Sequence, residues 1–132
     1  MRGPLSTEQL TSIFGFHPSV RFVTVVDENG TVLDSAKRAG LNPPEPPEET
    51  RKMMERWADV RNLAAVSDEF YGKMKTIIIR REKLTELLFP LTGFMVVVVV
   101  HPAFPLDKTS HLENLLRNLK VGGDEWRGAL TA

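Results

Sequence analysis

The order of its hydrophobic patterns is the feature that most constrains what this chain can fold into. Helical spacing, strand-like runs and turn formers follow one another in the order α-β-β-α-β-β-β-α. The predicted helices span residues 6–14, 47–71 and 107–121, and the predicted strands span 22–26, 31–36, 74–80, 84–89 and 94–101. This order indicates a fold far more strongly than it indicates a function.

The most apolar run of the chain, Phe94–Val100, predicts an interior strand. A helix that spans a bilayer needs about 18–20 apolar residues, so this short run does not predict membrane insertion. Successive side chains of a strand point to opposite faces of its sheet. We therefore expect its even-numbered residues on one face, its odd-numbered residues on the other, and helices covering both faces.

Turn and capping residues set the expected boundaries of these elements. The turn formers Asp27–Gly30 predict a hairpin between the first two strands, with the glycine at positive φ. Pro90–Gly93 fits a type I turn between the last two strands. Gly15 is expected to end the first helix, and Asp107 is expected to cap the last one.

Length and charge limit the classes of protein to which this chain can belong. Its 132 residues predict one domain over 1–123, followed by a tail over 124–132. The 17 basic and 17 acidic residues cancel, so no broad field is expected to attract nucleic acid or an anionic membrane. The chain has no cysteine and begins without the apolar stretch of a secretory signal, and both features favour the cytoplasm.

Metal-binding motifs are weak in this sequence. The three histidines are dispersed along the chain: His17, His101 and His111. A segment that starts at Asp27 resembles the beginning of a calcium loop, but Arg38 stands where a bidentate glutamate should close it. A hairpin turn is the favoured interpretation of that segment, and we expect no metal.

Catalytic motifs are absent from the sequence as well. No serine lies in a Gly-x-Ser-x-Gly elbow, and no glycine-rich loop precedes a Lys-Ser/Thr pair. A basic cluster within 73–83 favours a solvated edge hairpin over phosphate binding, because no aromatic residues interleave its charges. The two PxxP spacings within 43–47 are common in linkers. We therefore expect no enzymatic activity and no cofactor.

The element order, together with the passage Thr76–Val100, resembles the roadblock/dynein-light-chain superfamily, which is close in fold to profilin. The passage reads strand, charged turn, strand, proline-containing turn and hydrophobic strand, and the resemblance covers roughly residues 5–121. Asp68–Gly72 and Arg80–Lys83 are also similar to an uncharacterised archaeal family of roadblock-like proteins.

The resemblance implies an α+β fold with a five-stranded antiparallel sheet, one long helix on one face and two on the other. It further implies no enzymatic activity and a homodimer formed through the third strand and the second helix. Many members bind small Ras-like GTPases or serve as scaffold subunits. We map none of the superfamily's partner contacts onto this chain.

The expected homodimer interface combines the edge strand with the long helix. An edge that carries three consecutive isoleucines invites pairing with an identical edge. The long helix has apolar residues at helical spacing, and its predicted length of about 36 Å exceeds the width of a small sheet. The expected interface residues are Met53, Trp57, Lys75, Thr76, Ile77, Ile78 and Ile79.

The leading functional hypothesis is therefore a non-enzymatic, dimeric protein-interaction module that regulates or scaffolds a small Ras-like GTPase. The alternative is a regulatory domain that senses a small molecule in a pocket between the sheet and the long helix. An enzyme without a recognised motif is a third possibility. The valine-rich fifth strand offers few polar groups to such a pocket, so the sequence favours a filled core.

Overall fold

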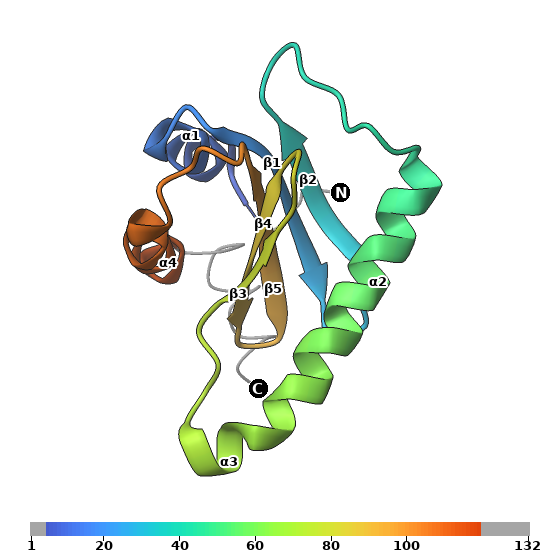
Figure 1. The fold of residues 1–132 in the computed structure, drawn as a ribbon, viewed down its shortest axis with the longest axis vertical. Coiled ribbons are helices and arrows are strands. Elements are labelled where there is room, and N and C mark those ends of the chain that lie inside the picture. The colour runs from blue at the N-terminus through green and yellow to red at the C-terminus, as the bar shows by residue number, and fades with distance from the viewer. Residues whose placement is uncertain (1–4, 120–132) are drawn as a thin grey trace.

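The fold has three layers, a sheet between two layers of helices (Figure 1). The structure is a computed structural model that describes residues 5–119, so the expected tail 124–132 lies outside the described residues. The helices α1 (Thr7–Phe16) and α4 (Thr109–Asn118) cover one face, and α2 (Pro47–Ala64) covers the other. The predicted α+β architecture with helices on both faces is confirmed.

All neighbouring strands of the sheet run antiparallel, in the order β2-β1-β5-β4-β3. The strands are β1 (Val20–Asp27), β2 (Val32–Lys37), β3 (Ile77–Arg80), β4 (Thr85–Leu91) and β5 (Phe94–Val100). The valine-rich β5 occupies the centre, where Val98 pairs with Val23 on one side and Leu87 on the other. The strand β3 is an outer edge.

Two hydrophobic cores lie on the two faces of the sheet. The larger one, beneath α1 and α4, takes the even-numbered residues of β5 together with Ile13 and Leu112. The smaller one, beneath α2, takes odd-numbered residues of β5 together with Met54 and Leu88. The predicted alternation along β5 is confirmed.

The first and last helices differ from the prediction at their boundaries. A capping box at Ser6 starts α1, but Gly15 does not end it: the helix continues to Phe16, whose ring packs 6.4 Å from that of Phe104. Asp107 does not cap α4, because it lies in the 3-10 turn η2 (Leu106–Lys108) that precedes the helix. The helix also ends earlier than predicted, at Asn118.

The long helix is interrupted where it leaves the sheet. After Ala64 the chain forms the 3-10 turn η1 (Ala65–Ser67) and then the short helix α3 (Asp68–Tyr71), where the sequence predicts one helix to residue 71. Neither segment buries a residue, so no packing holds it in register with α2. The buried face of α2 is also rotated slightly from the predicted one, with Met54 and Ala58 in the core and Met53 and Trp57 only partly buried.

The turn between β4 and β5 is tighter than predicted, and β3 is shorter. Pro90 and Leu91 stay within β4, and the turn proper is Thr92–Gly93, with Gly93 at φ +80°. The amide position of residue 90 points toward the β3 side, where a proline cannot donate to a neighbouring strand. The β3 ladder accordingly begins at Ile77, opposite Leu88, and not at residue 74.

Candidate functional site

Within residues 5–119, the backbone groups on the outer side of β3 are unpaired. The N–H of Arg81 donates to the carbonyl of Leu84 at 2.9 Å, which extends the β3–β4 ladder by one pair. Because hydrogen-bonded residues alternate in an antiparallel ladder, the backbone of Ile77 and Ile79 faces β4. The N–H and C=O groups of Ile78 and Arg80 therefore face away from the sheet. This edge can pair with another strand.

The structure brings four of the seven expected interface residues together. Met53, Trp57, Ile77 and Ile79 pack beside the core under α2 and are partly buried. Ile78 lies on the opposite face of β3 and is 43% exposed. The other two, Lys75 and Thr76, lie in the connection before β3, so the strand itself does not include them.

A second exposed apolar surface follows α2, and it is not among the predicted sites. We call it the distal patch: Leu63 of α2, Val66 of η1, and Phe70 and Tyr71 of α3. Each of these side chains is more than 70% exposed. In Figure 1 the segment lies beyond the end of the sheet. The signal in the sequence was an aromatic pair directly before Gly72.

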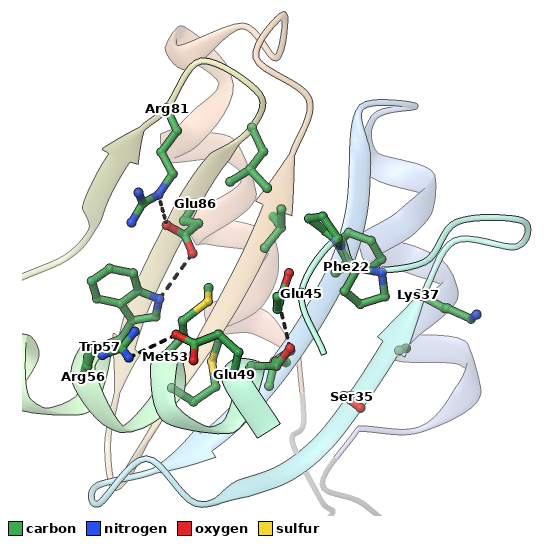
Figure 2. Close-up of a pocket in the computed structure, with 18 residues that line it drawn as sticks. Phe22, Ser35, Lys37, Glu45, Glu49, Met53, Arg56, Trp57, Arg81 and Glu86 are labelled. Carbon is green, nitrogen blue, oxygen red and sulfur yellow. Dashed lines mark hydrogen bonds and ion pairs between the residues drawn. The ribbon is translucent and has the colours of Figure 1, made fainter. Parts of the chain in front are cut away.

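A groove of about 770 Å³ separates the first half of α2 from the sheet (Figure 2). Its walls are mainly apolar and come from α2, from β1, β2, β4 and β5, and from the proline-rich loop, and they include Phe22, Met53, Met54, Trp57, Leu84 and Val99. The expected filled core between sheet and helix is therefore present around Met54 and Leu88, but it does not extend along the first half of α2. Valine on β5 does not close the space, because α2 diverges from the sheet toward its N-terminus (Figure 1).

Glu86 is the deepest polar group of this groove. Its side chain is 1% exposed and accepts hydrogen bonds from Trp57 Nε1 at 3.3 Å and from Arg81 Nε at 3.1 Å. The Arg81 guanidinium also lies 5.9 Å from the centre of the Trp57 ring. From the sequence, Arg81 is expected in a solvated basic cluster, but it is the counter-ion of a buried carboxylate.

The other charged groups of the groove have partners within the described part of the chain. Figure 2 shows Glu49 paired with Arg56 at 3.1 Å. Glu45 accepts a hydrogen bond from Thr50 at 2.7 Å. Lys37 donates a hydrogen bond to Asn42 at 2.6 Å. Because each charged group already has a partner and the walls are mainly apolar, the groove suits an apolar occupant better than an ion.

On the exposed face of α2, Arg51 bridges two glutamates. It contacts Glu48 and also Glu55, at 2.7 Å. The hydrogen bond from Arg51, and after it the positive charge of Arg51, lowers the pKa of Glu48. This exposed network lies outside the groove.

The segment that resembles a calcium loop is a hairpin turn. Asp27 Oδ1 accepts the N–H groups of Asn29 and Thr31 at 2.8 and 2.9 Å, and Gly30 has φ +85°. No group of three His, Cys, Asp or Glu side chains in residues 5–119 is arranged to hold a metal ion. In the same range, no helix has both the length and the apolar character required to cross a membrane.

Comparison with solved structures identifies the architecture. No family model and no curated protein matches the sequence. A Roadblock/LC7 domain from Streptomyces avermitilis superposes with a TM-score of 0.67 at 11% identity, covering 96% of this chain and 98% of that one. The gliding protein MglB from Thermus thermophilus gives 0.65 at 16% identity, covering 83% of each chain. A structure described as MglB with tetrameric arrangement gives 0.66 at 16% identity, covering 81% of this chain and 78% of that one.

These similarities cover 81% to 96% of this chain. At such low sequence identity, these similarities establish the fold alone. The partner of the protein and the archaeal origin suggested by its sequence stay predictions. The chain therefore has the roadblock/LC7 fold, as the resemblance in its sequence predicts.

Proposed function

We propose that this protein is a non-enzymatic, homodimeric protein-interaction module of the cytoplasm. The observation that carries the proposal is the open β3 edge, whose Ile78 and Arg80 backbone groups face outward next to an apolar band. Antiparallel pairing of two such edges about a two-fold axis gives those groups partners and leaves neither β3 edge open.

A small Ras-like GTPase is the proposed partner of this dimer. Support comes from the roadblock/LC7 fold, since many roadblock proteins bind such GTPases or scaffold their complexes. The solved structure described as MglB with tetrameric arrangement supports self-association as a property that this fold allows. A continuous sheet shared by two copies would present both α2 helices on one face, which gives a partner a broad, two-fold symmetric surface.

The dimer is tested by Ile78→Lys, with Val32→Lys as its matched control. Both positions are apolar, lie on outer strands and are similarly exposed, at 43% and 39%. Paired β3 strands would bring two like charges together in the first variant, whereas β2 lies at the other edge. Light scattering coupled to size exclusion should show the mass of a dimer for the parent and for Val32→Lys, and a shift toward monomer for Ile78→Lys.

A parent protein with the mass of one chain at micromolar concentration would contradict the dimer. So would a dimer that is indifferent to Ile78→Lys. Arg81→Ala is not a suitable control for this experiment, because Arg81 donates a hydrogen bond to the buried carboxylate of Glu86.

The partner is tested with the small Ras-like GTPases of the source organism, each loaded with GDP or with a non-hydrolysable GTP analogue. Binding measured by biolayer interferometry should be stronger for one nucleotide state and should weaken for Ile78→Lys. The protein alone should not hydrolyse GTP. If no GTPase binds in either state, the GTPase part of the proposal fails while the dimer remains.

A further inference from the structure

We propose that the groove is filled by the distal patch of the second copy, with Phe70 and Tyr71 of one protomer seated under α2 of its partner. This inference rests on the proposed homodimer and adds a second, reciprocal contact to the paired β3 edges. The occupant of the groove is thus a segment of the same protein.

The first observation is that, among residues 5–119, nothing covers the side chains of the distal patch. Phe70 is 76% exposed and Tyr71 89% exposed, and neither η1 nor α3 buries any residue. Scattered apolar side chains are normal on a surface, but four exposed apolar side chains within residues 63–71, two of them aromatic, are typical of an interface. The patch therefore needs an apolar partner surface.

The second observation is that the groove is an apolar surface in need of an occupant. About 770 Å³ lies between α2 and the sheet, and the volume is large enough for aromatic side chains. Met53 and Met54 are flexible and polarizable, so they can adapt to rings that enter it. Four of the six charged side chains that line it form ion pairs with one another, and its walls are mainly apolar, which favours apolar side chains over a charged ligand.

The two surfaces lie at opposite ends of the sheet. Asp68 of α3 and Gly93 of the β4–β5 turn line one shared hollow, which places α3 at the end of the sheet where β3 begins. Arg81 and Leu84 of the β3–β4 turn line the groove, which lies at the end where β3 finishes. One copy cannot bring its own patch to its own groove without unfolding α2.

Antiparallel pairing brings these opposite ends together. When β3 pairs with its symmetry mate, the beginning of one strand lies beside the end of the other. A two-fold axis perpendicular to the shared sheet keeps both α2 helices on the same face. The α3 segment of each copy then approaches the Arg81 end of the groove in its partner. The five residues 72–76, at up to about 3.4 Å each, give α3 a reach of up to about 17 Å from the start of β3.

Interface size provides a third reason for a second contact. The strand β3 has four residues, so its paired edge is about 13 Å long, whereas a stable dimer buries roughly 800 Å² on each partner. Burial of one Phe and one Tyr side chain supplies on the order of 150–250 Å² each. A reciprocal contact of this kind supplies the area that the short edge lacks.

Charge also favours this arrangement. Glu69 precedes the aromatic pair and forms no ion pair within residues 5–119. Arg81 stands at the near rim of the groove, and within the same range its terminal nitrogens have no hydrogen-bond partner. An acidic residue beside the aromatic pair thus meets a guanidinium with free donors.

The chain has no cysteine, so a disulfide between introduced cysteines tests the contact directly. The variant Phe70→Cys/Met53→Cys should form a covalent dimer on mild oxidation. An intrachain bond is excluded, because the α2 segment from residue 53 to 64 alone rises about 16 Å and a disulfide requires Cα atoms within about 7 Å. The matched control is Phe70→Cys/Ser12→Cys, with the second cysteine on the exposed face of α1.

We expect at least ten-fold more cross-linked dimer from the Met53 pair than from the Ser12 pair at equal protein concentration. Equal cross-linking in the two variants would overturn this inference. So would the absence of cross-linking in both, if light scattering still shows a dimer that is sensitive to Ile78→Lys. Either result would leave the proposed dimer intact. A parent that is a monomer would overturn both.

A second readout uses Phe70→Ser, which changes an exposed side chain and should leave the fold of each copy unaltered. The apolar dye 8-anilinonaphthalene-1-sulfonate should bind weakly to the parent dimer and several-fold more to Phe70→Ser, whose groove is open. The variant should also dissociate at a concentration at least ten-fold higher than the parent. If the dye binds equally to both dimers, the groove is open in the dimer and available to small ligands, and the inference is wrong.

Discussion

Replacement of Gly30 by alanine should weaken the packing of the β1–β2 turn against α2, which positions this helix on the sheet. Gly30 lies in the β1–β2 turn with φ +85°, and it is buried against the helix. A Cβ atom at this position would lie 2.5 Å from Glu55 Cα, 2.7 Å from the Met54 carbonyl oxygen and 2.9 Å from Glu55 N. All three are backbone atoms, so a change of side-chain rotamer cannot relieve the contact.

The expected decrease in the free energy of unfolding has two parts, which a matched control separates. A side chain at positive φ costs about 1–2 kcal/mol, partly offset by the lower entropy of the unfolded chain. Gly40 has φ +83° with nothing within 4 Å of its Cβ position, so Gly40→Ala should show this part alone. At Gly30 the turn must also move away from α2 by about 1 Å, and overpacking of this kind costs about 1–3 kcal/mol. The same movement strains the 3.0 Å hydrogen bond from Asn62 Nδ2 to the carbonyl of Glu28.

Urea unfolding, followed by circular dichroism at one protein concentration, measures the difference. The Gly30→Ala midpoint should lie below that of Gly40→Ala by an amount that corresponds to about 2 kcal/mol, at a similar m-value. Equal midpoints would mean that the turn does not press on α2 in solution. They would also refute our account of the groove, whose depth depends on where this helix lies.

Three further predictions concern the core and the charges. Val98→Asp, at a fully buried position in the central strand, should abolish soluble folding, and a soluble variant that melts like the parent would contradict the sheet order. Arg81→Ala should cost about 1–3 kcal/mol in urea unfolding, because it removes a donor from the buried carboxylate of Glu86, whereas alanine at the exposed lysine two residues later should change little. The pKa of Glu48, measured by carbon NMR titration, should lie below its ordinary value, so this carboxylate stays charged to lower pH. Arg51→Ala should return the pKa of Glu48 toward the ordinary value, and a pKa that is the same in the variant and the parent would contradict the ion pair.

The element order could be predicted because each strand and helix carries its own local signal. The run Phe94–Val100 reads as a strand buried on both faces, and its alternation between two cores follows from strand geometry alone. The hairpin at Asp27–Gly30 follows from turn chemistry. Helix ends were less predictable. Gly15 does not stop α1, because Phe16 gains packing against the core by remaining helical.

A pocket between the sheet and the long helix was an alternative hypothesis from the sequence, but its position and the distal patch could not be predicted, because both depend on the direction of α2 relative to the sheet. The periodicity of α2 shows which residues are apolar, but not where the helix axis leaves the sheet. Gly30 reads as a turn residue in the sequence, and nothing there indicates that it also allows the turn to touch the helix backbone. The pairing of Arg81 with Glu86 joins a turn residue to a strand interior, and it too depends on the three-dimensional arrangement.

The contacts that hold α2 explain why the described part of the chain has both an open groove and an exposed apolar segment. Gly30 and the Asn62–Glu28 hydrogen bond hold the helix near the β1–β2 turn, and Trp57 holds its middle through Glu86. Toward its N-terminus the helix diverges from the sheet, which opens the groove, and past its C-terminal end the chain runs beyond the sheet, which exposes the patch (Figure 1). One oblique helix therefore creates a cavity at one end and a projection at the other. In the proposed dimer, the antiparallel two-fold axis places the cavity of one copy next to the projecting segment of the other. The oblique direction of α2 therefore makes the surfaces of two copies complementary.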